Sequence, residues 1–382
     1  MWASEPTLVV WAIYLLLVPF YVFKSGLPQP GDMFILVLVP IALRGWNGRM
    51  SNAARLAFRP LLVFTIWVCV VDYAWAIGLG NFDLFGRDTF ILFPIYYIYN
   101  AFIFLSAILL YRRFGDAFLR LTVEVVLVTI YVQAATSLVF QSTAVRGSLF
   151  FNSPNQLGYF ALLAASLIAL THRRLKMKLV STCAALSCCA YLALISASRA
   201  SVLGIAILFA LIVFTNPRVI IVTSIIAVIV LMVGGPISDA LESTQQRVLA
   251  DNSARGGFFE ERGYDRIAEH PEYLMFGAGE GGLARFDSTS RSRDRMGRPR
   301  AIEIHSSFGM IVFSYGIIGS LVFMLFMWRI IKGAPLRLSM MLLPPMLYTI
   351  AHQGLRFTML WVLLAIFVCL KEPIRTKVVA AP

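Results

Sequence analysis

Apolar residues along this chain are gathered into long unbroken runs, and polar residues fill the short segments between them. The runs are about 15 to 24 residues long, and a helix of about 20 residues crosses a hydrocarbon core roughly 30 Å thick while satisfying its own backbone hydrogen bonds. The pattern therefore predicts an all-α polytopic membrane protein with about twelve transmembrane helices, over residues 8–23, 30–43, 58–78, 89–110, 118–140, 156–171, 178–196, 201–214, 219–235, 304–328, 337–351 and 357–370.

The composition supports this class. Apolar residues make up 59% of the chain and charged residues only 14%, and mean hydropathy is +0.78, so the chain is far more apolar than a soluble domain. All of the cysteines fall inside the apolar runs, which indicates small core residues rather than a disulfide framework or a metal site. They are Cys69, Cys183, Cys188, Cys189 and Cys369.

Lysine and arginine are unevenly distributed between alternate loops. If the amino terminus is cytoplasmic, each short outer loop carries at most one of them, whereas the inner segments carry clusters such as Arg112 and Arg113. Short loops rich in these residues stay in the cytoplasm, so the asymmetry supports an even number of spans. The net charge of +13 then reflects membrane orientation, and the expected partner is the lipid bilayer and not nucleic acid.

Three parts of the chain follow from this topology. Residues 1–235 hold the first nine transmembrane helices, residues 236–303 form one large outer, periplasmic loop with helical segments, and residues 304–382 hold the last three helices and a cytoplasmic tail. Apart from His270, every basic residue of the loop is arginine. Because the planar guanidinium binds phosphate and carboxylate groups with two parallel hydrogen bonds, this bias suggests that the loop binds anionic groups.

Three of these arginines have helical spacing. Arg255, Arg262 and Arg266 are related by i, i+7 and i+11, which places them on one face of a helix that we expect to end at His270 and Pro271. The alternative is an exposed face paired with neighbouring acids. The following GAGEGG is not interpreted as a dinucleotide-binding motif, because no strand precedes it and no βαβ unit surrounds it.

Several polar residues lie at the outer ends of the predicted spans. Arg146 and Asn155 flank the start of the sixth span, and Arg199 lies between the seventh and eighth spans. An arginine near hydrocarbon needs a partner, a water-filled cavity or a path to the interface, and simple snorkelling remains an alternative for Arg199.

Two histidines are candidates for acid–base chemistry. His305 precedes the tenth span, close to Glu303, and His352 lies near Arg356 in AHQGLRF. A lone histidine at a helix entrance is often a capping residue. An imidazole there is also suited to accept a proton near neutral pH, and Glu303 could orient the ring or share that role. We take His305 as the candidate base and His352 as its rival.

The ordered series FNSPNQLGYF, SASRAS, HPEYLMFGAGEGG and EIHSSFGMIVFSYGIIG resembles the O-antigen ligase and O-antigen polymerase superfamily of bacterial envelope glycosyltransferases. The resemblance covers residues 146–325, and it extends to the first five spans only in topology. It includes the position of the large loop between the ninth and tenth spans.

The resemblance implies a GT-C-like enzyme of the bacterial inner membrane with its active site facing the periplasm. Such an enzyme uses neither a metal nor another cofactor. It takes a glycan from an undecaprenyl diphosphate carrier and transfers it to a hydroxyl of a glycan or lipid acceptor, alongside other polysaccharide-assembly proteins. The arginine of the Ser-Arg motif falls on Arg199 and the histidine on His305, whereas the spacing of the loop arginine fits none of Arg255, Arg262 and Arg266 cleanly.

The expected chemistry is an inverting single displacement. The histidine removes a proton from the acceptor hydroxyl, and arginines stabilise the departing diphosphate. A polymerase is slightly favoured over a ligase because the chain is compact. A flippase or transporter would favour two related halves, which the sequence does not show. A metal-dependent enzyme would need paired carboxylates in the first outer loop, which offers only Asp32.

Overall fold

The computed structural model describes residues 5–23, 29–44, 50–82, 90–139, 147–213, 262–280 and 304–371. Within these ranges the regular structure is entirely helical, as predicted. The ninth predicted span, most of the loop and three site candidates lie outside the described residues. Those candidates are Arg146, Arg255 and Glu303.

Among the described residues, five helices are long and apolar enough to cross a membrane: α4 (Asn52–Gly78), α5 (Leu92–Phe114), α6 (Asp116–Val139), α7 (Pro154–His172) and α14 (Ser307–Ile331). Shorter apolar helices are α1 (Pro6–Leu17), α2 (Pro30–Met33) with α3 (Ile35–Leu43), α8 (Leu179–Ile195), α9 (Arg199–Val213), α15 (Leu336–Ala351) and α16 (Thr358–Leu370). The described loop segment holds α13 (Asp265–Glu269) and the 3-10 helix η2 (Pro271–Tyr273). These lengths and compositions are compatible with a multi-pass membrane protein.

Some helices begin or end at other residues than the predicted spans, because a proline or a capping side chain sets the helix end. α1 ends at Leu17 and not near residue 23, because Pro19 cannot donate a backbone hydrogen bond and restricts the residue before it. α4 begins at Asn52, before the apolar run, because the Ser51 side chain accepts a hydrogen bond from the amide of Ala54 at 3.2 Å. Arginines near the start of α4 therefore lie inside the helix.

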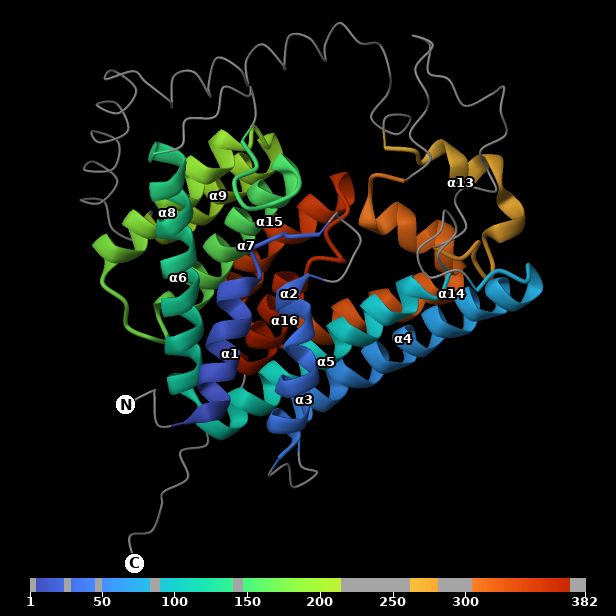
Figure 1. Cartoon of the computed structure of the whole chain (residues 1–382), viewed down its shortest axis with the longest axis horizontal. Coiled ribbons are helices and arrows are strands. Elements are labelled where there is room, and N and C mark those ends of the chain that lie inside the picture. Colours follow the sequence, from blue (N-terminus) through green and yellow to red (C-terminus); the bar gives the residue numbers. More distant parts are fainter. Residues whose placement is uncertain are drawn as a thin grey trace, which may run out of the picture.

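α7 and α16 form the centre of the bundle (Figure 1). Every residue of α7 from Leu157 to Thr171 is buried, and so is every residue of α16 from Met359 to Cys369. α7 packs against α8, α9, α15 and α16, whereas α4 and α5 pack against α14 and α16. This placement puts the N-terminal ends of two central helices next to each other.

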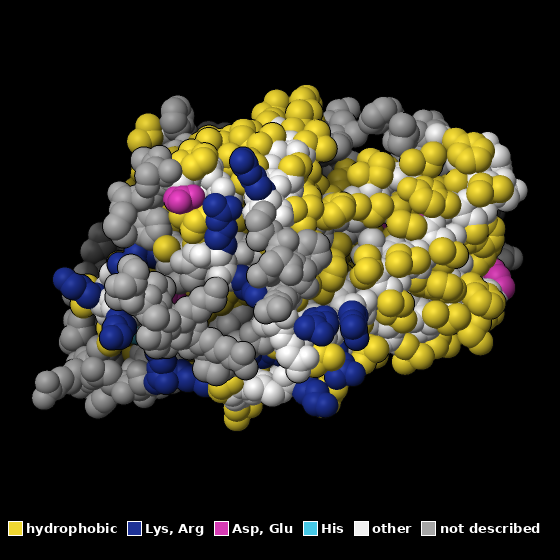
Figure 2. Space-filling view, turned by 90° about the horizontal axis from the view of Figure 1, so that it is seen from below, with side chains coloured by type: hydrophobic (Ala, Val, Ile, Leu, Met, Phe, Trp, Pro, Cys, Tyr) yellow, Lys and Arg dark blue, Asp and Glu magenta, His cyan; other side chains and the backbone are white. Residues whose placement is uncertain are grey.

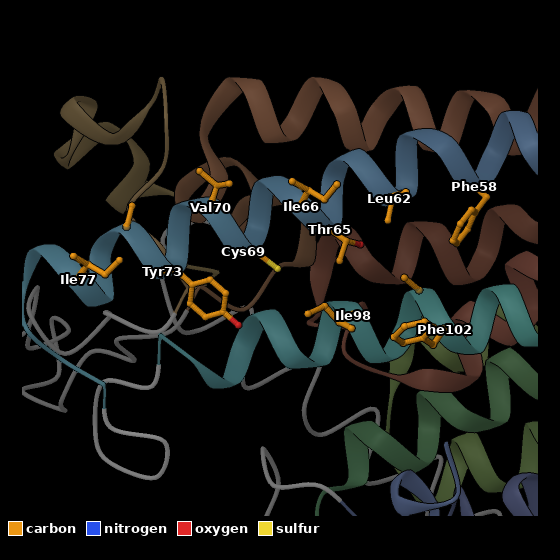
Figure 3. A pocket seen from close by; sticks show the side chains of 12 residues that line it. Phe58, Leu62, Thr65, Ile66, Cys69, Val70, Tyr73, Ile77, Ile98 and Phe102 are labelled. Atoms are coloured by element: carbon orange, nitrogen blue, oxygen red, sulfur yellow. The ribbon is translucent and has the colours of Figure 1, made fainter. Parts of the chain in front are cut away.

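The face of α4 that points away from the helix bundle presents apolar side chains to the surroundings. Leu62, Ile66, Val70 and Ile77 are each 45% exposed or more, and Figure 2 shows an almost uncharged face over this helix, with lysine and arginine gathered elsewhere. A groove of about 560 Å³ between α4 and α5 opens on this side (Figure 3). Its lining is apolar apart from a few hydroxyl and thiol groups, so it suits hydrocarbon and offers no ionic chemistry.

The loop segment that follows η2 docks into a break in α14. Gly316 has φ 65° and ψ −169°, which interrupts the helix and leaves the carbonyl groups before it without their helical partners. The amides of Ala278 and Gly279 donate to the carbonyl oxygens of Phe313 and Ser314, each at 2.9 Å. A Cβ on Gly277 would lie 2.2 Å from the Ser314 oxygen, so only glycine allows this close approach.

Candidate active site

A cavity of about 280 Å³ lies where four helix ends meet. Its walls come from the N-terminal end of α7, the residues before α14 and α16, and the residues after α15. The lining residues are Ser153, Asn155, Gln156, Tyr159, Arg262, His305, Tyr348, His352, Gln353 and Phe357. The cavity therefore combines one guanidinium, two imidazoles, neutral hydrogen-bonding groups and aromatic rings.

The N-terminal end of α7 is built by a capping box. The Ser153 side chain accepts from the amide of Gln156 at 3.3 Å, and the Gln156 side chain accepts from the amide of Ser153 at 3.2 Å. Pro154 follows as the first helical residue, where its missing N–H costs nothing. Asn155, in the first turn, is thus held at the cavity and is largely exposed.

His305 lies immediately before the cap of α14, as predicted for a histidine at a helix entrance. Its backbone amide donates to the carbonyl oxygen of Arg262 at 3.0 Å. The next residue, Ser306, caps the helix by accepting from the amide of Gly309 at 3.1 Å, and its hydroxyl contacts the Tyr264 hydroxyl at 2.6 Å. The loop segment is therefore joined to the helix entrance at His305 itself and at Ser306.

Arg262 and His352 face each other within the cavity. Arg262 Nη1 lies 3.5 Å from His352 Nδ1, at the outer limit of a hydrogen bond. The His352 carbonyl oxygen accepts from the amide and the hydroxyl of Ser307, at 3.2 and 3.1 Å. These bonds tie the C-terminal end of α15 to the N-terminal end of α14, so the two histidines are positioned by one hydrogen-bonded junction.

The cavity is electrostatically suited to an anion. The N-terminal ends of α7, α14 and α16 all reach it, and each carries partial positive charge from aligned peptide dipoles. Arg262 adds a full positive charge, and no carboxylate lies among the described lining residues. Among the described helices that line the cavity, only α15 contributes its C-terminal end, which carries partial negative charge.

Three aromatic rings are stacked along one wall. Tyr159 and Tyr348 have ring centroids 4.3 Å apart with planes tilted by 13°, and Tyr348 stacks on His352 at 4.5 Å and 27°. The Tyr348 hydroxyl donates to the carbonyl oxygen of Asn155 at 3.1 Å. The stack therefore connects α7 to the end of α15 and fixes the orientation of the His352 ring.

The structure thus brings together four sequence candidates, namely His305, Arg262, His352 and Asn155. Arg199 is the first residue of α9 and is not among the residues lining the cavity. It follows a tight turn in which Ala197 has φ 50°, and this turn packs against Gly158 of α7. Arg199 is therefore close to the helix that forms one wall, in a connection as short as predicted.

Arg266 lies in α13, is 9% exposed and is not among the lining residues of the cavity. The prediction that Arg262 and Arg266 share one face of a helix is wrong. The helix α13 begins only at Asp265, and Gly263, which lies between the two arginines, has φ 75°. The helix does end before His270 and Pro271, as expected. Arg262 therefore precedes the helix and is turned to the cavity independently of Arg266.

Arg356 belongs to a different cluster. Its Nε and Nη2 donate to Glu280 Oε1 at 2.9 and 2.5 Å, and its guanidinium lies 4.4 Å from the centre of the Phe93 ring. Glu280 Oε2 accepts from the hydroxyls of Tyr315 at 2.7 Å and Tyr97 at 3.1 Å. Arg356 therefore pairs with a carboxylate of the glycine-rich segment.

A second buried carboxylate completes that cluster. Asp72 Oδ1 accepts from the Glu280 amide at 2.8 Å, and Asp72 Oδ2 lies 3.3 Å from the Tyr315 hydroxyl oxygen. Asp72 is 0% and Glu280 1% exposed. The cluster anchors the segment that carries Arg262 to α4, α5 and α14, so residues 277–280, the described part of GAGEGG, have a structural role that the sequence did not reveal.

Sequence reasoning missed most of the neutral lining residues. Tyr159, Tyr348 and Phe357 are embedded in apolar runs and look like core residues, and Gln353 follows His352 without a motif of its own. The one available signal was the cap sequence Asn-Ser-Pro-Asn-Gln, which places Gln156 three residues after Ser153.

Within the described ranges, no group of three histidine, cysteine, aspartate or glutamate side chains is arranged to hold a metal ion. Compared with known proteins, the chain matches no family description, no curated protein and no solved structure.

Proposed function

We propose that this protein is a membrane glycosyltransferase that moves a glycan from an undecaprenyl diphosphate carrier to an acceptor hydroxyl, with inversion and without a metal. The observation that carries the proposal is the convergence of Arg262, His305 and His352 on one cavity at the ends of apolar helices. A base and an anion-binding group at the membrane interface are the two parts that this transfer requires.

His305 is the proposed general base. Its imidazole accepts the proton of the acceptor hydroxyl while the hydroxyl oxygen attacks the anomeric carbon. The bond between that carbon and the diphosphate oxygen breaks, and its electron pair leaves with the diphosphate. The new glycosidic bond forms on the opposite face of the sugar, so the configuration inverts.

His352 is the weaker candidate for the base. Its Nδ1 faces the guanidinium of Arg262 at 3.5 Å, and a proton added to the ring would lie beside a permanent positive charge. The stack with Tyr348 and the contact with Arg262 favour a role in orienting the guanidinium. This geometry supports His305 over its rival.

Arg262 is the proposed diphosphate-binding residue. Its fork can hold two phosphate oxygens, and the helix N-terminal ends around it favour the charge that develops on the leaving group. Arg199 is proposed to bind a more distant part of the donor, because its turn packs on α7. The GT-C-like arrangement of about twelve spans, the periplasmic orientation and the inner-membrane location belong to the same proposal.

The test is a transfer assay in lipid nanodiscs, with undecaprenyl-diphosphate-linked repeat units and a chelator present. In His305→Ala, kcat should fall by a factor of about 10² to 10⁴, as expected when a general base is removed. Arg262→Ala should lose activity, and Arg262→Lys should regain little of it, because lysine lacks the fork.

His172→Ala is the matched control, because His172 ends α7 away from the cavity and contacts Thr182. Full activity of His305→Ala would remove the assignment of the base. A ladder of products indicates a polymerase, and a single addition indicates a ligase. Passage of the lipid-linked sugar across the bilayer without any product would replace transfer by transport.

A further inference from the structure

The loop segment that docks into α14 reaches the middle of two apolar helices. The ring centre of Phe276 lies 6.4 Å from that of Trp67, which is eleven residues before the end of α4 at Gly78, about 16 Å along the helix. The carbonyl oxygen of Leu274 accepts from the amide of Ile317 at 2.7 Å, ten residues or about 15 Å inside α14. Both distances are about half of a hydrocarbon core roughly 30 Å thick.

Both helices are uncharged around this contact. In α4 no residue from Pro60 to Val71 carries a charge, and in α14 none from Ser307 to Trp328 does. Uncharged apolar stretches of this kind fit the hydrocarbon interior of a bilayer. The tip of the loop segment is therefore level with hydrocarbon and not with the aqueous phase.

The backbone of the segment is hydrogen-bonded as a hydrocarbon environment requires. Non-helical backbone is tolerated at membrane depth only where the protein satisfies its polar groups. The amides of residues 277–280 all donate hydrogen bonds of 2.8 to 2.9 Å, in turn to Tyr273, Phe313, Ser314 and Asp72. The carbonyl oxygen of Gly277 accepts from Trp75 Nε1 at 3.1 Å. The break in α14 and the segment therefore satisfy each other's backbone groups.

Two large apolar side chains at the tip remain exposed. Met275 is 53% and Phe276 62% exposed, although the residues that follow them are buried. The neighbouring helices are exposed at the same level, with Val70, one turn from Trp67, at 53% and Ile317 at 45%. The tip therefore continues the apolar face of α4, and acyl chains are the surroundings that suit this face.

We propose that residues 274–280 form a re-entrant segment within the membrane leaflet on the loop side, with Met275 and Phe276 in contact with lipid acyl chains. The loop between the ninth and tenth predicted spans is then not wholly aqueous. The inference rests on the membrane embedding that the proposed function includes, but not on the transfer reaction. The segment that carries Arg262 to the cavity is thereby attached to the lipid at its other end.

Depth-dependent fluorescence quenching tests this placement. Single cysteines are labelled with bimane in full-length protein whose native cysteines are replaced by alanine, in phosphatidylcholine nanodiscs. The quenchers are iodide in the water and phosphatidylcholine with a nitroxide on its acyl chain. Phe276→Cys should lose as much fluorescence to the nitroxide as Ile66→Cys, the lipid control on the exposed face of α4, and should be protected from iodide. Ala268→Cys, exposed beside Glu269 in α13, is the aqueous control and should be quenched by iodide.

The outcomes separate this placement from the proposed function. Iodide quenching at position 276 with lipid quenching at position 66 would overturn the re-entrant segment and leave the embedding of α4 intact. Protection from both quenchers would also overturn it, because another protein surface, such as a second copy, would then cover the tip. Absence of lipid quenching at both positions would reject the embedding and the proposed function together. Lipid quenching at position 276 in a protein without transferase activity would support the segment and reject the reaction.

A pair of substitutions at one position gives a second test. Phe276→Asp and Phe276→Ala both remove the ring and its contact with Trp67. A carboxylate is costly in hydrocarbon, whereas at an aqueous surface the two variants should differ little. Phe276→Asp should therefore unfold at a lower temperature than Phe276→Ala in nanodiscs. Equal unfolding temperatures would overturn the placement of the tip in lipid.

Discussion

The ion pair between Arg356 and Glu280 predicts an asymmetry between two substitutions that break it. The side chain of Glu280 is 1% exposed, whereas that of Arg356 is 26% exposed. Arg356→Ala therefore strands a carboxylate in the interior, next to a second buried carboxylate at Asp72. Glu280→Gln leaves a guanidinium that still reaches solvent and still lies over the ring of Phe93.

The expected magnitudes follow from this difference in burial. Removing one partner of a buried pair costs about 3 to 5 kcal/mol, and we expect the lower end for Arg356→Ala, because two tyrosine hydroxyls still donate to the stranded carboxylate. Glu280→Gln keeps the shape and an acceptor, so it should lose about 1 to 2 kcal/mol. The double variant should recover toward Glu280→Gln alone, because the buried charge is gone.

The assay is equilibrium unfolding in mixed micelles for wild type, both single variants and the double variant. Additive losses in the double variant, or a larger loss for Glu280→Gln than for Arg356→Ala, would refute the reasoning from burial.

Three further outcomes follow from close contacts. Gly277→Ala should release the loop segment from α14 and increase cleavage of that segment by protease, because the new Cβ would lie 2.2 Å from the Ser314 oxygen. Gly333→Ala is the control for backbone strain alone, because Gly333 also has a positive φ but a Cβ there would meet nothing within 4 Å. Gly354→Ala should displace the Tyr159 ring, because the new Cβ would lie 2.8 Å from the Tyr159 hydroxyl oxygen, and the variant should therefore unfold at a lower temperature than wild type. His305→Gln should keep the cap of α14 and its thermal stability while losing kcat, because the backbone amide of His305 and not its ring makes the contact with the loop.

Much of the described fold could be predicted from the sequence because long apolar helices are encoded locally. The run of apolar residues before Arg112 predicts α5, and Ser153 with Gln156 predicts the start of α7. The placement of His305 at a helix entrance was also predictable, since a polar segment changes there into an apolar run. Local signals of this kind depend on neighbours within a few residues.

The candidate site could be predicted only in part. His305 was named as a candidate, but the spacing could not separate Arg262 from Arg266, because Arg262 reaches the cavity through the positive φ of Gly263 and the contact with His352. Tyr159 could not be identified, because a tyrosine in an apolar helix has the same sequence pattern whether it fills the core or faces a cavity. Its neighbours in the wall come from segments about 190 residues away.

For the described residues, the sequence by itself indicated which segments are helical, where several of them begin and which side chains are candidates for acid–base or anion-binding chemistry. The tertiary structure decided which of these residues meet. It placed Arg262 beside His352, paired Arg356 with Glu280 and inserted the glycine-rich segment into the break at Gly316. The physical reason is that hydropathy and capping act over one or two helical turns, whereas a site is formed by packing between distant segments, whose partners no local pattern specifies.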